Sequence, residues 1–293
     1  MPAQRIDGKL IAQTIEKTIA TKVKRLRRRG ITPSLAVLLV GKHKASETYV
    51  RKKAQAAKRV GIDFTLHRLP GNTSRKKIIE TLRTIQKDPR LSGLIVQLPL
   101  PEPLYTRDVL NSIDPTVDVD CLSDENFGKL VAGYPRVTPP TPGAIFAILK
   151  HLQISLRGKQ VTIVGTGLLV GRPLATMLMN AEATVTTCNI YTKNLADVSK
   201  KADILISAVG KKGLITGSMV KKGAIVIDAG VDFVNNDLFG DVDQKTVIQK
   251  ASFLTPTPGG VGPLTVSHLL SNVVLCAERR FLPTAKTSRK NLY

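Results

Sequence analysis

Short apolar runs alternate with longer stretches of helical periodicity along the first part of the chain. Two of the runs have the length and the leucine- and valine-rich content of buried strands, and a third is more polar but strand-like. The stretches between them repeat their apolar residues every three to four positions. The predicted strands cover 34–40, 63–69 and 94–98, and the predicted helices cover 9–28, 46–60 and 74–87. Strands that alternate with helices of this length predict a parallel sheet of the α/β class.

The alternation stops between residues 114 and 142, where Asp, Pro, Gly and Thr dominate. Proline restricts its own backbone and that of the preceding residue, so this segment is expected to be a rigid, turn-rich connection and a domain boundary. A helix over 144–152 and strands over 160–164, 183–188, 203–209 and 224–228 then resume the alternation. A chain of 293 residues, 42% of them hydrophobic, suits two such domains.

The strand at 160–164 runs into the glycine-rich turn Gly165-Thr-Gly167-Leu-Leu-Val-Gly171, which is followed by a predicted helix over 174–180. A strand, a glycine turn and a helix form the phosphate-binding arrangement of a Rossmann unit. The first glycine permits the tight turn, the second lets the backbone approach a pyrophosphate, and the third permits close helix packing. The third glycine comes one residue later than in the common fingerprint, and glycine turns also end ordinary strands. The three strands that follow favour nucleotide binding.

The end of the second Rossmann strand normally contacts the adenosine ribose. Here it reads Asn189-Ile190-Tyr191-Thr192-Lys193, with no carboxylate for a 2′-hydroxyl and no arginine fork for a 2′-phosphate. The choice between NADP and NAD therefore stays open at this point. The residues expected at the cofactor are Gly165, Thr166, Gly167, Val170, Gly171, Arg172, Pro173, Tyr191, Thr192 and Lys193.

Four polar side chains in the first half are candidates for acting on one small molecule. Tyr49 and Lys53 are four residues apart in a predicted helix, so they share a face, and Gln97 and Asp120 end nearby apolar segments. Together they could converge on a ligand and move a proton.

The structural alternative makes Lys53 one more exposed cation in a lysine-rich helix, and Asp118 and Asp120 turn formers beside Pro115. Gln97 is harder to explain in this way, because a buried amide must find hydrogen-bond partners.

Several segments together resemble the bifunctional methylenetetrahydrofolate dehydrogenase/methenyltetrahydrofolate cyclohydrolase family. They follow the family's order from Ile6 to about Leu275. The segments are Ala45-Ser-Glu-Thr-Tyr49-Val-Arg-Lys-Lys53, Gly93-Leu-Ile-Val-Gln97-Leu-Pro-Leu-Pro101, Asp118-Val-Asp120, Pro139-Pro-Thr-Pro142, Val170-Gly-Arg-Pro173 and Pro258-Gly-Gly-Val-Gly-Pro-Leu-Thr265.

The resemblance implies an N-terminal α/β folate-substrate domain over 1–140, completed by a C-terminal helix at about 264–281. It implies a Rossmann domain with a parallel sheet over 141–263, an active cleft between the domains, and a homodimer formed through the Rossmann halves. Residues 282–293 are expected to be a basic tail. One-carbon metabolism, purine biosynthesis and NADP as cofactor are further family expectations.

The resemblance also implies roles for individual residues. Lys53 matches the catalytic lysine, which could transfer protons if burial and neighbouring cations lower its pKa. Tyr49 would orient Lys53, Gln97 would polarise the substrate, and Asp120 would hold the pterin N–H groups. The substrate-binding set is Tyr49, Gln97, Leu98, Pro99, Asp120, Pro258, Gly259, Gly260, Pro263 and Thr265.

The chain departs from the family pattern mainly in the dinucleotide half. Thr166 and Gly167 replace the usual Arg-Ser, and Asn189-Ile190-Tyr191 replace the usual His-Ser-Arg, positions associated with the 2′-phosphate of NADP. Val117 stands for a lysine, Cys121 for a glycine and Pro140 for a cysteine. One alternative is therefore mainly a cyclohydrolase with weak or NAD-dependent dehydrogenase activity. A shikimate-type dehydrogenase is a further alternative, because that class also joins a substrate domain to a Rossmann domain.

The formal net charge of +22 raises the further alternative of a basic nucleic-acid-binding protein. Aromatic residues make up only 4% of the chain, so a solvated basic surface is favoured over a base-stacking site. We expect no nucleic-acid partner, no membrane span, no signal peptide and no metal site. Three widely spaced cysteines favour a reducing cytoplasm.

Overall fold

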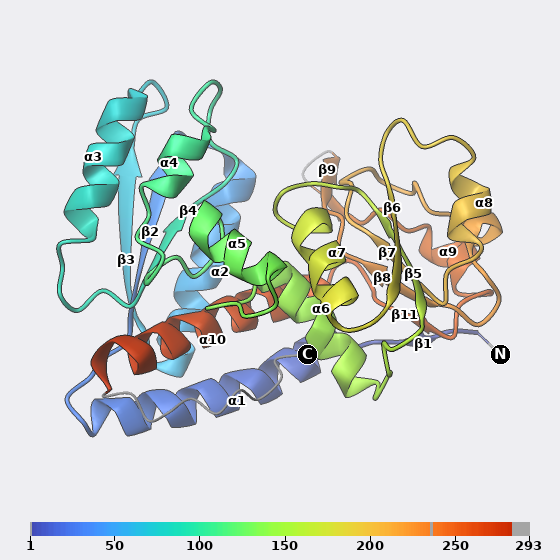
Figure 1. Cartoon of the computed structure of the whole chain (residues 1–293), viewed down its shortest axis with the longest axis horizontal. Helices are drawn as coiled ribbons and strands as arrows, with labels where there is room; N and C mark the ends of the chain where they lie inside the picture. Colours follow the sequence, from blue (N-terminus) through green and yellow to red (C-terminus); the bar gives the residue numbers. More distant parts are fainter. Residues whose placement is uncertain (1, 235–236, 283–293) are drawn as a thin grey trace. The chain divides into compact units, whose positions relative to one another are not determined.

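The computed structural model describes residues 2–234 and 237–282, which form two compact units (Figure 1). Among the described residues, the three-stranded unit contains residues 14–139 and 266–282. The six-stranded unit contains residues 2–13 and the described part of 140–265. Both units have a parallel sheet with helices, which confirms the predicted α/β class.

The three-stranded unit is built around β2 (Ser34–Val40), which pairs in parallel with β3 (Asp63–Leu69) on one side and β4 (Gly93–Val96) on the other. Residues 35–40 of β2 are all buried, the continuous apolar run that parallel strands show when both faces are covered. The helices of this unit are most of α1 (Gly8–Arg27), α2 (Lys44–Val60), α3 (Arg75–Ile85), α4 (Arg107–Asn111), α5 (Asp124–Val131) and most of α10 (Val261–Phe281).

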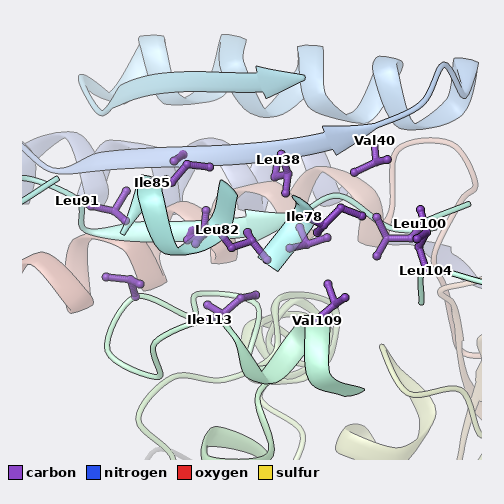
Figure 2. Close-up of a cluster of buried hydrophobic side chains, with 14 residues drawn as sticks. Leu38, Val40, Ile78, Leu82, Ile85, Leu91, Leu100, Leu104, Val109 and Ile113 are labelled. Atoms are coloured by element: carbon purple, nitrogen blue, oxygen red, sulfur yellow. The ribbon is translucent and has the colours of Figure 1, made fainter. Parts of the chain in front are cut away.

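Helix α3 closes one face of this sheet. Ile78, Leu82 and Ile85 recur at helical spacing and pack on Leu38 and Val40 of β2 (Figure 2). Each such side chain, fully buried, contributes about 1.5–3 kcal/mol. Leu94 and Val96 of β4 belong to the same cluster, so the cluster also holds the strand whose carboxyl end is followed by Gln97.

The six-stranded unit has the strand order β1-β11-β8-β7-β5-β6, with every neighbouring pair parallel. Its strands are β1 (Gln4–Arg5), β5 (Gln160–Val164), β6 (Thr184–Cys188), β7 (Ile204–Ser207), β8 (Ile225–Asp228) and β11 (Phe253–Leu254). β9 (Asp232–Val234) and β10 (Asp237–Phe239) pair in the antiparallel direction and form a separate two-stranded sheet. The helices are α6 (Pro140–His151), α7 (Gly171–Asn180), α8 (Leu195–Ser199), the 3₁₀ turn η1 (Gly217–Met219) and α9 (Gln244–Val247). β5 lies between β6 and β7, the reversal of strand order at which doubly wound sheets bind nucleotides.

The predicted turn-rich connection over 114–142 was wrong in part, because it contains α5 and the start of α6. Ser123 caps α5 by accepting a hydrogen bond from the Asn126 backbone, a capping signal that the proline-rich surroundings obscured. Helix α6 starts at Pro140 because proline needs no backbone N–H in the first helical turn.

The placement of all of residues 1–140 in one domain was also wrong at the N-terminus. β1 pairs with β11, and the Ile6 backbone donates to Leu254 O, so the first residues belong to the six-stranded unit. A two-residue strand is too short to show any hydrophobic period. Residues 283–293 of the predicted basic tail lie outside the described residues.

Helix α10 begins at Val261, three residues before the predicted start. Within the described part of the chain it is the one helix long and apolar enough to cross a membrane, but 56% of its apolar stretch is buried inside the fold. Leu269, Leu270, Val273 and Val274 are core residues. The buried Asn272 donates from Nδ2 to Val119 O at 2.9 Å and to Thr138 O at 2.8 Å, so α10 holds two loops of the three-stranded unit.

Replacing Asn272 with alanine is expected to lower the free energy of unfolding by about 2 kcal/mol, because two buried carbonyls lose their donor. Urea unfolding followed by circular dichroism measures the change. The matched control is Gln55→Ala on the exposed face of α2, expected to stay within about 0.5 kcal/mol of the parent chain. Equal stability of the two variants would show that Asn272 does not hold the loops.

Candidate active site

Helix α2 presents Tyr49 and Lys53 on one face. His43 caps its start, with Nδ1 accepting from the Ser46 backbone at 3.4 Å, and Gly61 ends it in the left-handed region at φ 82°. Tyr49 and Lys53 are partly buried, whereas residues 51 and 52 between them are exposed. The interpretation of Lys53 as one more exposed cation is therefore wrong.

Gln97 follows β4 directly and is 7% exposed. Its backbone N–H donates to Leu38 O at 2.9 Å, so it continues the sheet. Its side-chain Oε1 accepts a hydrogen bond from Lys53 Nζ at 3.0 Å, and its Nε2 donates to Leu98 O at 2.8 Å. Both ends of the amide are thereby fixed. Gln97, rather than the expected Tyr49, orients the Lys53 amine.

Asp118 and Asp120 have different environments although they are two residues apart. Asp118 is fully buried and its carboxylate accepts from the Leu122 and Ser123 backbones, the Ser123 hydroxyl and Asn126 Nδ2, at 2.7–3.1 Å. Asp118 is therefore a structural residue that holds the start of α5. Sequence reasoning missed Ser123 and Asn126, although a serine followed by Asp124 and Glu125 is a signal for the start of a helix.

Asp120 and Lys53 act on one another electrostatically. Burial raises the pKa of Asp120 to about 6, opposed by the Lys53 charge and reinforced by Asp118. Burial lowers the pKa of Lys53, opposed by the charge of Asp120. Burial also raises the pKa of Tyr49, so its phenol stays protonated and able to donate. The three groups combine an amine with an increased neutral fraction, a carboxylate and a hydroxyl donor, which is suitable for proton transfer.

The glycine turn of the six-stranded unit has the shape of a phosphate-binding loop. Gly165 lies at φ 104°, and a Cβ there would collide with Ala208 O. A Cβ at Gly171 would collide with Gly165 O, whereas a Cβ at Gly167 would meet nothing within 4 Å. Gly165 and Gly171 thus let α7 start tightly against the end of β5, and Gly167 leaves its surroundings open. This geometry fits a dinucleotide pyrophosphate.

The end of β6 forms a compact polar turn beside this loop. The Tyr191 backbone donates to Asn189 Oδ1, and the Asn189 backbone donates to Thr192 Oγ1, both at 2.9 Å. This turn leaves the side chains of Ile190 and Tyr191 about nine-tenths exposed, at 90% and 87%, and Lys193 exposed as well. The predicted cofactor residues Tyr191, Thr192 and Lys193 are therefore accessible to a ligand.

The predicted substrate-binding segment 258–265 belongs to the six-stranded unit. Pro258 to Gly260 form a turn with Gly259 at φ 108°, and Gly260 packs so closely on Gly8 that a Cβ on Gly8 would collide with Gly260 O. Pro263 and Thr265 lie in the first turns of α10 rather than in a loop. Leu98 and Pro99 follow Gln97 in the three-stranded unit, with Pro99 exposed.

Two buried aspartates that sequence reasoning missed fix the loops after β7 and β8. Asp241 accepts from the Ser207 hydroxyl and from the backbones of residues 209, 210 and 211 at 2.7–2.9 Å. Asp228 accepts from the backbones of Gly230, Asp241 and Val242. Burial raises the pKa of Asp228 to about 6. Both lie at the carboxyl edge of the sheet, where nucleotide-binding loops must be held rigid.

Comparisons with known proteins agree with this geometry. The family model for the catalytic domain of tetrahydrofolate dehydrogenase/cyclohydrolase matches residues 6–120, and the model for its NAD(P)-binding domain matches residues 139–281. The bifunctional protein FolD of Nitratiruptor sp. is 45% identical over 278 residues, 94% of this chain and 99% of the relative.

Solved structures give the same result. The bifunctional FolD enzyme of Campylobacter jejuni has a TM-score of 0.91 at 39% identity and covers 95% of this chain and 99% of its own. A Trypanosoma brucei FolD complexed with NADP and an inhibitor has a TM-score of 0.92 at 36% identity, with 95% and 98% covered. Shikimate dehydrogenase of Thermus thermophilus has a TM-score of 0.52 at 15% identity, a likeness of fold that does not favour the shikimate-type alternative.

The matched domains define a two-domain folate-metabolising enzyme that is both oxidoreductase and hydrolase. The chain belongs to the tetrahydrofolate dehydrogenase/cyclohydrolase family.

One departure from the family pattern falls where the backbone itself favours glycine. Cys121 has φ 59°, the left-handed region that favours glycine, so the family glycine matches a backbone requirement that this chain meets with a buried cysteine.

Asp118→Asn is expected to lower the free energy of unfolding by about 2 kcal/mol, because an amide group replaces an acceptor that faces several donors.

Asp120→Asn is expected to behave differently. Because burial raises the pKa of Asp120 to about 6, the folded state binds a proton more tightly than the unfolded state, and this group destabilises the fold as pH rises from about 4 to about 6. Asp120→Asn removes that loss, so the variant gains stability relative to the parent chain across this window.

Urea titrations at several pH values between about 4 and 7 measure both effects. A constant difference between Asp120→Asn and the parent chain across this range would contradict the raised pKa of Asp120. An Asp118→Asn variant as stable as the parent would contradict the structural function of Asp118.

Proposed function

We propose that this chain oxidises methylenetetrahydrofolate to methenyltetrahydrofolate with a nicotinamide dinucleotide and hydrolyses the product to formyltetrahydrofolate, with Lys53 transferring protons. The observation that carries the proposal is the hydrogen bond from Lys53 Nζ to Gln97 Oε1 at 3.0 Å, in a site where burial lowers the pKa of Lys53. The family match supports both reactions.

In the first step the carbon that bridges two folate nitrogens loses a hydride, and a dinucleotide held by the glycine turn over 165–171 would supply the nicotinamide acceptor. The product is a cation whose charge is shared by the two nitrogens, so the step requires no strong base. The residues of this chain bind and orient the substrate, and the carboxylate of Asp120 is suited to accept hydrogen bonds from the amino and ring N–H groups of the pterin.

The second step adds water to the bridging carbon of that cation. The water oxygen forms a bond to the carbon and loses a proton, for which the neutral amine of Lys53 is the acceptor. One carbon–nitrogen bond then breaks as the hydroxyl proton leaves and a carbonyl forms, and the departing nitrogen takes up a proton from the Lys53 ammonium. The balance is one water consumed and one proton released for each ring opened.

Gln97 and Tyr49 support Lys53 in different ways. Gln97 is a positioning residue, because its Oε1 accepts from the amine while its Nε2 is tied to Leu98 O. The Tyr49 phenol, kept protonated by burial, is a donor on the same helical face and is available to the substrate or to the attacking water. Leu98 and Pro99, with the segment 258–265, complete the proposed folate contacts.

The proposed cofactor is NADP, with NAD as the alternative because Thr166 and Tyr191 replace the arginines that the family resemblance leads one to expect. Support comes from the T. brucei relative, which was solved with NADP. A cyclohydrolase with weak or NAD-dependent dehydrogenase activity would show little hydride transfer to NADP⁺. Steady-state rates with each dinucleotide distinguish the two.

We further propose that the enzyme is cytoplasmic, forms a homodimer through its six-stranded units and supplies one-carbon groups for purine biosynthesis. Its three cysteines are buried and free, as suits a reducing compartment. Light scattering tests the dimer.

We also expect no nucleic-acid partner, and a salt-titrated nucleic-acid binding assay tests this expectation. Affinity for DNA or RNA at physiological ionic strength would contradict it.

Lys53→Met is expected to reduce cyclohydrolase turnover about 100- to 10,000-fold, the usual contribution of a positioned general acid–base. The loss of methenyltetrahydrofolate absorbance with time measures it. The matched control is Lys58→Met, an exposed lysine on the same helix, which is expected to keep the parent rate. Unchanged turnover in a folded Lys53→Met variant would refute the proposed function of this residue.

A further inference from the structure

Arg172 is held across the glycine turn of the six-stranded unit by two hydrogen bonds. Its backbone N–H donates to Gly167 O, and its side-chain Nε donates to Thr166 O, each at 3.1 Å. The guanidinium therefore bends back over the residue that replaces the family arginine. Arg172 is exposed, and none of the ion pairs between described residues involves it. Its terminal amino groups remain available as donors.

A chain of contacts connects this guanidinium to the end of β6. Thr166 follows Gly165, whose backbone N–H donates to Cys188 O at 2.8 Å. Cys188 ends β6, and Asn189 begins the turn that occupies the ribose-reading position of a Rossmann fold. The glycine turn and the ribose-reading turn are thus joined at one corner of the sheet, and Arg172 lies on that corner.

The charges at this corner favour an anion. A carboxylate after β6 would accept a hydrogen bond from the 2′-hydroxyl of NAD and would repel a 2′-phosphate. Residues 189–193 contain no carboxylate and end in Lys193. A planar guanidinium that has one edge fixed by Nε still offers its remaining N–H groups to phosphate oxygens.

We propose that Arg172 binds the 2′-phosphate of NADP, in place of the arginines that relatives carry at positions 166 and 191, and so gives this chain a preference for NADP. The inference rests on the proposed function, because it concerns the dinucleotide site of that enzyme. It resolves the choice of cofactor left open by Thr166 and Tyr191 in favour of NADP.

The test is a calorimetric titration of the full chain with 2′,5′-ADP and with 5′-AMP, which share the adenosine and differ in the 2′-phosphate. The parent chain is expected to bind 2′,5′-ADP more tightly. Arg172→Gln is expected to weaken 2′,5′-ADP binding about 10- to 100-fold, as for the loss of a hydrogen bond to a charged group, and to leave 5′-AMP binding unchanged. Arg172→Lys is expected to keep part of the preference, because the charge remains and the fork is lost.

The control is Lys150→Gln, which removes an exposed cation at the end of α6 and is expected to bind both ligands as the parent does. Thermal unfolding of Arg172→Gln checks that the glycine turn has kept its fold. Equal losses for both ligands in this variant would place Arg172 at a group that they share and overturn the proposal. So would an unchanged preference in Arg172→Gln, or a preference lost in Lys193→Gln instead. A parent chain that binds neither ligand would contradict the dinucleotide site itself, a failure distinct from that of Arg172.

Discussion

The proposed chemistry depends on one hydrogen bond, from Lys53 Nζ to Gln97 Oε1. It joins α2 to the carboxyl end of β4, and the amide cannot turn away because its Nε2 is bound to Leu98 O. The low polarity around the pair strengthens the bond and at the same time disfavours the lysine charge. Position and reduced basicity of the amine therefore have the same physical origin, the burial of the α2 face that carries Lys53.

The structure separates carboxylates that hold the fold from Asp120, the one that the proposed function assigns to the ligand. Asp118 has its hydrogen-bonding capacity filled by backbone and side-chain donors, and Asp241 in the other unit is filled in the same way. Asp120 instead carries the electrostatic cost of burial, which raises its pKa to about 6. Carboxyl groups close in sequence thus differ because of the number of donors around them, which no count of residues along the chain reveals.

The sequence was sufficient for the elements that have a long hydrophobic period and for the residues that carry the family motifs. It predicted β2, β3 and β5 to the residue, because each is a short strand-like segment that ends at a glycine or proline turn. It failed for β1 and α5, because a two-residue strand has no period and a capped helix beside several prolines resembles a loop.

Within the site, the sequence brought Tyr49 and Lys53 together through helical spacing, and it marked Gln97 as an amide that needed partners. It assigned the orientation of Lys53 to Tyr49 rather than to Gln97, because a contact across 44 residues depends on how α2 packs on the sheet. The hydrogen bond from Arg172 to Thr166 could not be predicted from the sequence for a related reason, because it depends on how the glycine turn folds back.

The hydrogen bonds of Asp118 also bear on how a ligand is received. They fix the backbone two residues before Asp120 to the start of α5 through donors inside the protein, so the segment needs no ligand to become ordered. In the proposed function, a pterin that binds Asp120 meets a preorganised acceptor, and little conformational entropy is lost on binding. The rigidity of this segment then favours the pterin, because a fixed carboxylate cannot shift to reach a ring whose N–H donors lie at other positions.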